Sequence, residues 1–240
     1  MAVDGVRAAA SAGLVDLFSE LSRIPLHPPD KHEVLSMITS ICVHALGPDV
    51  AVSVFLGEPS SPKHVGWDCG RAQELDGAQM VAAEGPSFTA WETGATVTTE
   101  DLRSDSRWPH LAERIGRAEV GMAMAVPVLR EDRGGGVLNL YARPGRLLDD
   151  EESRVAGLVA DTLAAVLQEM DEKAELETLA DQLQEALQSR AVIDQAKGMI
   201  MLREHCDADA AFRRLVELSS KSNVKLREVA RHIVDGTTHR

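Results

Sequence analysis

The chain has 240 residues, of which 38 are acidic and 25 basic, and its formal net charge at pH 7 is −13. No apolar stretch approaches the roughly 20 residues that a membrane-spanning helix needs, and the N-terminus lacks the pattern of a secretory signal peptide. The three cysteines, Cys42, Cys69 and Cys206, are an odd set without the spacing of a metal site. We therefore expect a reduced, cytoplasmic protein with no metal, no cofactor and no membrane partner.

Residues 1–165 are long enough for one domain with its own core. Apolar spacing predicts helices over residues 14–21 and 34–42, on either side of a proline-rich break. Pro127 has no amide hydrogen to give a neighbouring strand, so it should lie at a sheet edge or a bulge. Three runs rich in β-forming residues predict strands, the last two of them paired as a hairpin, over residues 51–56, 122–129 and 136–142.

A set of short motifs in this region resembles the GAF family of sensor domains. The resemblance implies an α+β domain, an antiparallel sheet flanked by helices, which often encloses a small-molecule pocket. We place this GAF-like domain at residues 12–167. The motifs are Gly85-Pro-Ser87, Ala90, Gly94, Asp101-Leu, Ser106-Arg-Trp-Pro109, Gly121 and Leu138-Asn-Leu-Tyr-Ala142.

A ligand pocket in the GAF-like domain is expected to have an aromatic wall, because all three tryptophans fall in its loops and helices. Ser87 stands where many relatives have cysteine, so thiol chemistry cannot be carried over to this chain. The alternatives are an interaction surface without a ligand and a degenerate sensor. The candidate lining residues are Ser87, Trp91, Trp108, Met122 and Tyr141.

No catalytic residue is predicted. Ser87, His110 and the carboxylates Glu100, Asp101 and Asp105 carry the chemical groups of a hydrolase. However, no nucleophile elbow, phosphate-binding glycine loop, metal-binding helix motif or kinase signature accompanies them. We therefore expect a regulator and not an enzyme.

Residues 168–187 combine regularly spaced leucines with many carboxylates, a pattern typical of an amphipathic connector. No proline or glycine lies between Leu158 and Lys197, so one helix can run from the first domain into the tail. The apolar phase changes at Leu176, which resembles a stutter in a coiled coil. We predict a coiled-coil connector that pairs two copies of the chain, and the alternative is a single helix packed on its own sensor domain.

The tail is predicted to form three short helices around a small common core. Asp207 is the expected N-cap of the second helix, and the third is expected to begin at Asn223, with residues 219–223 as the turn between them. The predicted core members are Ile193, Ile200, Phe212, Leu215, Leu226 and Ile233.

The tail differs in charge from the rest of the chain. From residue 188 onward, ten basic residues stand against seven carboxylates, a net charge of +3, so residues 1–187 carry −16. Such a local excess favours a polyanionic partner, although scattered charges are more often only a solvated surface. Gly198 lies inside the first tail helix, where glycine costs about 1 kcal/mol relative to alanine. Close approach of another backbone, for example that of a neighbouring helix in the bundle, would explain it.

The tail sequence resembles the ANTAR family, whose members bind paired hairpin loops in nascent messenger RNA and prevent transcription termination. The matching run is Arg190-Ala-Val-Ile-Asp-Gln-Ala-Lys-Gly-Met-Ile-Met201, followed by Ala210-Ala-Phe-Arg-Arg-Leu215, Ser219 to Asn223, Leu226 and Ala230. We place the ANTAR-like domain at residues 188–236. The resemblance and the chemistry of RNA loops imply contacts from Arg190, Lys197, Gly198, Arg203, Ser219, Asn223 and Lys225.

The combined expectation is a bacterial, homodimeric, signal-responsive antitermination regulator. No aspartyl phosphorylation site is evident, so its input would be a small molecule, a protein partner or a redox change. A ligand-responsive DNA-binding regulator is one alternative, because a small basic helical tail can also carry a helix-turn-helix. The other is a protein-interaction or dimerisation module that binds no nucleic acid.

Overall fold

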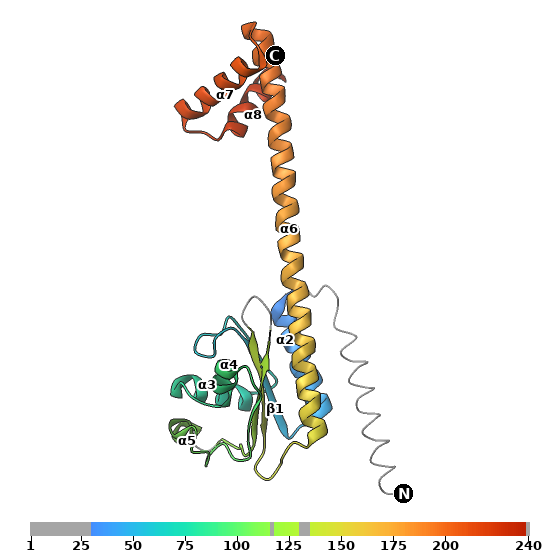
Figure 1. Ribbon diagram of the computed structural model, residues 1–240, viewed down its shortest axis with the longest axis vertical. Helices are drawn as coiled ribbons and strands as arrows, with labels where there is room; N and C mark the ends of the chain where they lie inside the picture. Colours follow the sequence, from blue (N-terminus) through green and yellow to red (C-terminus); the bar gives the residue numbers. More distant parts are fainter. Residues whose placement is uncertain (1–29, 116–117, 130–134, 239–240) are drawn as a thin grey trace, which may run out of the picture. The chain divides into compact units, whose positions relative to one another are not determined.

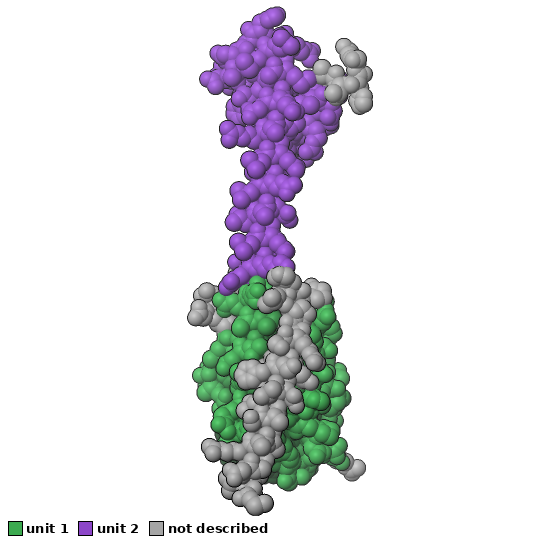
Figure 2. Space-filling view, turned by 90° about the vertical axis from the view of Figure 1, so that its right-hand side faces the viewer, with its two compact units in different colours: residues 1–171 green, residues 172–240 purple. Residues whose placement is uncertain are grey.

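A computed structural model describes residues 30–115, 118–129 and 135–238. The chain divides into two compact units, residues 1–171 and 172–240 (Figure 2). The helix predicted over residues 14–21 lies outside the described residues, as do residues 130–134 between the last two predicted strands. Among the helices that are described, none combines the length and the apolar character of a membrane-spanning segment.

The first unit is built on a five-stranded antiparallel sheet with the strand order β2-β1-β5-β4-β3. The three predicted strands form its centre, and the pairing of β4 with β5 confirms the predicted hairpin. Both edge strands were missed, because four and three residues are too few for a periodic pattern. The strands are β1 (Val50–Leu56), β2 (His64–Trp67), β3 (Val97–Thr99), β4 (Ala123–Val128) and β5 (Gly136–Ala142).

Pro127 lies where no neighbouring strand needs a hydrogen bond from its backbone nitrogen. It pairs with Val137 on one side, while β3 extends only along Ala123, Met124 and Ala125 on the other. Pro127 is therefore beyond the end of β3 and occupies a local edge, as expected for a residue without an amide hydrogen.

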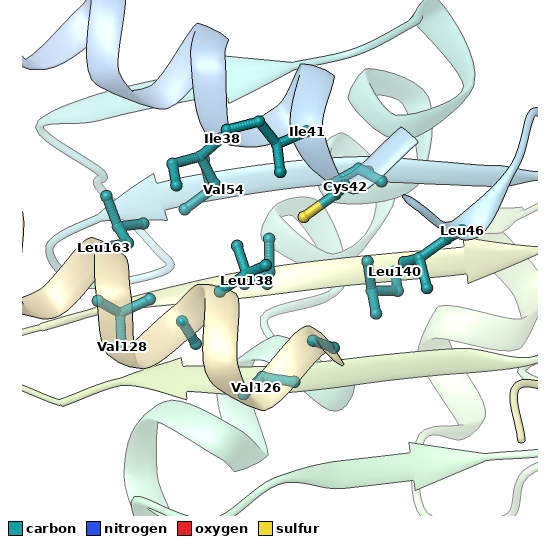
Figure 3. Close-up of a cluster of buried hydrophobic side chains, with 14 of the residues drawn as sticks. Ile38, Ile41, Cys42, Leu46, Val54, Val126, Val128, Leu138, Leu140 and Leu163 are labelled. Carbon is teal, nitrogen blue, oxygen red and sulfur yellow. The ribbon is translucent and has the colours of Figure 1, made fainter. Parts of the chain in front are cut away.

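Helices cover both faces of the sheet (Figure 1). On one face lie α2 (Lys31–Leu46) and the first part of α6 (Asp150–Glu204), and Figure 3 shows the core between them and the sheet. Cys42 is fully buried in that core, and burial raises the pKa of its thiol to about 12, which favours the protonated, less reactive form. The other face carries α3 (Gly70–Ala82), α4 (Pro86–Thr93) and α5 (Pro109–Ile115).

Helix α6 is continuous over 55 residues, which confirms the prediction of one helix from the sensor into the tail. Asp149 starts it, since its carboxylate accepts hydrogen bonds from the amides of Glu151 and Glu152 at 2.9 and 2.8 Å. Leu163 and Leu167 are fully buried in the first core. The leucines that follow the phase change are 51–69% exposed, namely Leu176, Leu179, Leu183 and Leu187. The phase change therefore separates leucines that pack on the sheet from leucines that do not.

In the second unit, α7 (Ala208–Ser222) and α8 (Leu226–Thr238) pack with the end of α6. Asp207 is the N-cap of α7, as predicted, and accepts from the amide of Ala210 at 2.7 Å. Asn223 does not begin the third helix. It ends α7 in the left-handed conformation at φ 54°, which asparagine tolerates well, and the expected turn over residues 219–222 is helical.

The prediction that Phe212 belongs to the tail core is wrong. Its side chain is 41% exposed, and the centre of the bundle is formed by Ala196, Ala211, Ala230 and Leu215. Three alanines at the contact let the helices approach closely, so no space is left there for an aromatic ring. Ile200 is buried as predicted, and the other predicted members are partly buried, namely Ile193, Leu226 and Ile233.

Candidate functional site

Lys197 lies on α6 beside the exposed ring of Phe212. Its ammonium is 6.0 Å from the ring centroid and 3.5 Å from Oδ1 of Asp194. The side chain is only 26% exposed, so its aliphatic part is held against the helix pair while the charge stays at the surface. A cation next to an exposed aromatic face can contact a phosphate and stack a base at the same place.

Gly198 is exposed, and a Cβ atom added to it would meet nothing within 4 Å. Packing against a neighbouring helix of the bundle therefore does not explain this glycine. Ala196, two residues earlier, is fully buried in the bundle core. Because successive helical residues turn by about 100°, Gly198 lies on the side of α6 away from that core. The helix stripe at Gly198 is open to an outside partner.

The other predicted RNA contacts fall into separate groups. Arg190 is 83% exposed, and its Nε lies 3.9 Å from Oδ2 of Asp194, so this carboxylate stands between Arg190 and Lys197. Ser219, Asn223 and Lys225 lie at the connection between α7 and α8. The Ser219 hydroxyl donates to the carbonyl of Val224 at 2.6 Å and thus holds the turn.

Arg203 belongs to a third place, a groove that it lines together with Arg214 and His232. Neither Arg214 nor His232 could be singled out from the sequence, because the groove joins the end of α6 to α7 and α8. The sequence also misplaced Phe212, which it assigned to the core. Its helical spacing fits a core position, and only the packing of α7 on α6 shows that the ring is at the surface.

In the sensor unit, Ser87 and Tyr141 both belong to a buried polar network. The Tyr141 hydroxyl donates to Asp76 at 2.5 Å and accepts from Nε2 of Gln79 at 2.6 Å. The Ser87 hydroxyl donates to Oδ1 of Asn139 at 2.8 Å, and its amide donates to Oε1 of Gln79 at 2.9 Å. Both residues satisfy their polar groups within the protein, so a ligand at this place would have to replace existing bonds.

Asp76 is the common acceptor of this network. Beside Tyr141, the Ser53 hydroxyl donates to it at 2.9 Å and the indole nitrogen of Trp67 at 2.9 Å. Burial raises the pKa of Asp76 to about 6, although its hydrogen bonds act in the opposite direction. Burial and the nearby Asp76 charge likewise raise the pKa of Tyr141 well above its usual value.

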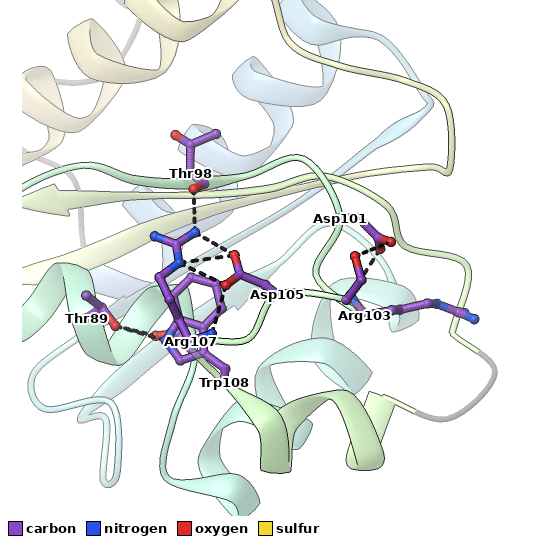
Figure 4. Close-up of polar contacts among 9 residues, drawn as sticks. Thr89, Thr98, Asp101, Arg103, Asp105, Arg107 and Trp108 are labelled. Atoms are coloured by element: carbon purple, nitrogen blue, oxygen red, sulfur yellow. Dashed lines mark hydrogen bonds and ion pairs between the residues drawn. The ribbon is translucent and has the colours of Figure 1, made fainter.

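Trp108 has a structural role (Figure 4). Its indole nitrogen donates to Oγ1 of Thr89 at 3.1 Å, and the guanidinium of Arg107 lies 4.2 Å above its ring. Arg107 is in turn held by Asp105 at 2.6 Å and by the carbonyl of Thr98 at 2.8 Å. The hydrogen bond from Arg107 holds the pKa of Asp105 well below its usual range. This clamp fixes the loop before α5.

Met122 cannot line a pocket with Ser87 and Tyr141. It is buried in the core on the opposite face of the sheet, where its sulfur accepts from the amide of Leu148 at 3.3 Å. Alternation along a strand sends neighbouring side chains to opposite faces, and the sequence left the direction of this one open. Trp91 is partly buried and packs against the core between the sheet and helices α3, α4 and α5, which includes Trp108. Over the described part of the chain, no three potential metal ligands lie together.

A model of the GAF domain family matches residues 29–168. The chain belongs to the GAF family. A model of the ANTAR domain matches residues 181–234, so this GAF protein carries an ANTAR domain at its C-terminal end. GAF and ANTAR are sensor and regulatory domains, and together they make the protein a GAF–ANTAR regulator.

Solved structures show the same GAF fold. The GAF domain of a phosphoenolpyruvate-protein phosphotransferase from Coxiella burnetii has 15% identity and a TM-score of 0.51, over 69% of this chain and 96% of that one. A GAF sensor protein from Burkholderia vietnamiensis has 12% identity and a TM-score of 0.51, over 68% and 98%. No curated protein matches the chain.

Proposed function

We propose that the ANTAR domain, residues 188–236, binds paired hairpin loops in nascent messenger RNA and prevents transcription termination under control of the GAF domain, residues 12–167. The observation that carries this proposal is the open helix surface at Gly198, next to Lys197. Gly198 costs helix stability, and a Cβ atom added to it would meet nothing within 4 Å, so a partner that approaches the backbone closely would explain it.

RNA suits this surface better than a neutral partner does. The tail carries a charge of +3 in a chain of −13, which directs a polyanion to it. Sequence-specific RNA proteins read unpaired loop bases by stacking and hydrogen bonding, together with phosphate contacts. Lys197 supplies the cation and Phe212 the exposed ring, while Arg190, Gly198 and Lys225 extend the surface along α6 and the α7–α8 connection. We keep Arg203, Ser219 and Asn223 as contacts, with Ser219 acting through the turn that it holds.

We also propose that the connector, residues 168–187, pairs two copies of the chain. Four leucines that are at least half exposed on one helix are an apolar surface that a second identical helix can cover. Two copies would present two ANTAR domains to two hairpins. The regulator would act by occupying the RNA in the cytoplasm, without chemical catalysis, and a small molecule or another signal at the GAF domain would set its activity.

The test is binding of the full-length protein to a two-hairpin RNA and to duplex DNA of equal charge over a series of salt concentrations. We expect selective RNA binding that weakens with salt, because phosphate contacts release counterions. Tighter binding to DNA would favour the helix-turn-helix alternative. No binding to either would favour an interaction module.

Lys197→Ala tests the proposed contact between Lys197 and the RNA. It removes one phosphate contact, so RNA affinity should fall and the slope of log affinity against log salt should decrease by about 0.7. Thermal unfolding should be unchanged, because the Lys197 ion pair with Asp194 is at the surface. Lys173→Ala is the control, since Lys173 forms a similar surface pair with Glu177 at 3.8 Å but lies in the connector. An unchanged affinity for Lys197→Ala would argue against this surface.

A further inference from the structure

The second unit contains a groove that is separate from the open surface at Gly198. Its volume is about 470 Å³, and it lies where the end of α6 meets α7 and the last turns of α8. This size falls within the ~300–1,000 Å³ typical of small-ligand pockets. The floor is aliphatic, formed by Ile200, Leu218 and Ile233 from the three helices.

The rim combines an apolar wall with cations. Leu202 lines the groove and is 79% exposed. Arg203, Arg214 and His232 are the basic residues of the lining, against the single carboxylate Glu204. The groove therefore offers both an aliphatic surface and positive charge.

The two arginines are arranged differently. Arg214 is oriented by two carboxylates, since its Nε lies 3.8 Å from Glu204 and its Nη1 3.2 Å from Glu217. Arg203 has no ion pair with any carboxylate in the described parts of the chain. A guanidinium carries five N–H donors in a planar fork, so both residues have donors left for a phosphate.

We propose that this groove takes one unpaired base of the RNA loop, with the adjoining phosphate bound by Arg203 and Arg214. The inference rests on the proposed RNA-binding function and adds a second contact region to it. A base that is turned out of its stack is commonly held between apolar side chains, which Leu202 and Leu218 provide here. The surplus of positive charge at the rim favours an anionic ligand such as a nucleotide over a neutral or a cationic one.

Gly236 makes the proposal testable without unfolding the bundle. It lines the groove from α8, is exposed, and a Cβ atom added to it would meet nothing within 4 Å. Gly236→Phe should place a ring in the groove, whereas Gly236→Ala also replaces the glycine by a better helix former but does not fill the groove. Leu202→Gln is a second variant, which removes the apolar wall at an exposed helical position and changes no charge.

The experiment measures the affinity of full-length wild type and variants for a two-hairpin RNA and for RNAs with one abasic nucleotide at each loop position. We expect Gly236→Phe and Leu202→Gln to bind the intact RNA about tenfold to a hundredfold more weakly, the range for loss of one stacked base, and Gly236→Ala to lose much less affinity than Gly236→Phe, because a methyl group does not fill the groove. One abasic position should weaken wild type by a similar factor and cause little further loss in Gly236→Phe, since both changes remove the same contact.

The outcomes separate this inference from the function on which it rests. If wild type binds RNA and the variants bind each RNA as tightly as wild type does, the base-binding proposal is wrong and the proposed function stands. Absence of RNA binding by wild type would overturn both. If Gly236→Phe dissociates a dimer at unchanged RNA affinity, the groove is an interface between copies and the base-binding proposal is wrong.

Discussion

At the residue scale, Asp76 shows how one carboxylate organises the second core of the GAF domain. Hydroxyls from β1 and β5 and an indole from β2 donate to it, so three strands of the sheet are joined to α3 through a single side chain. The carboxylate is buried and its hydrogen bonds are internal, which makes the protonation state of Asp76 a stability determinant of the whole unit.

The pH dependence of stability should carry the signature of Asp76. The folded pKa of about 6 lies above the ordinary 3.8, so the folded state binds the proton more tightly than the unfolded chain does. The contribution of Asp76 to the free energy of unfolding is therefore complete below pH 3.8 and is lost as pH rises through about 6. Between pH 4.5 and 7.5 the loss is about 2 kcal/mol.

The measurement is urea unfolding followed by tryptophan fluorescence, which reports only the GAF domain because Trp67, Trp91 and Trp108 all lie there. Asp76→Asn is the control, since it cannot titrate. The difference in unfolding free energy between wild type and Asp76→Asn should fall by about 2 kcal/mol from pH 4.5 to pH 7.5. A difference that does not vary with pH would show that Asp76 has an ordinary pKa.

At the scale of elements, α6 changes its role along its length. Leu163 and Leu167 pack on the sheet, the leucines from Leu176 onward face solvent, and Ala196 and Ile200 build the tail core. The apolar phase change thus has a structural cause in the chain itself, because the helix loses the sheet as a partner near residue 171. The open stripe at Gly198 is a fourth surface of the same helix.

Gly198→Leu should separate helix stability from partner binding. Leucine has a higher helix propensity, and nothing within 4 Å opposes its Cβ, so the tail should gain up to about 1 kcal/mol of stability. RNA affinity should nevertheless fall, because the added side chain covers the backbone that the loop approaches. Circular dichroism and RNA titration of the same samples check both parts. A variant that is more stable and binds RNA as wild type does would remove Gly198 from the RNA surface.

At the scale of the whole molecule, the exposed leucines of the connector predict self-association. Leu183→Glu would place like charges in the seam of a paired helix without loss of helix propensity. We expect wild type to sediment as a dimer at micromolar concentration and Leu183→Glu as a monomer. Gln182→Glu adds the same charge at a neighbouring exposed position and should stay dimeric. Monomeric wild type would make the connector a single solvated spacer.

Much of this architecture followed from the sequence because the signals are local. Alternation and apolar spacing found the central strands, the hairpin and the uninterrupted α6, and a carboxylate before an apolar run identified the cap at Asp207. These features depend on residues a few positions apart, so a periodic pattern contains them. The short motifs around Ser87 and Lys197 indicated both families for the same reason.

Only the tertiary structure decided which side chains meet. Phe212 is at the surface because alanines fill the helix contact, and Met122 lies across the sheet from Ser87. Arg203, Arg214 and His232 share a groove although they come from three helices. Helical or strand spacing defines the faces of an element, but the face that is buried is set by neighbours distant in sequence, through the volume and the hydrogen bonds that they offer.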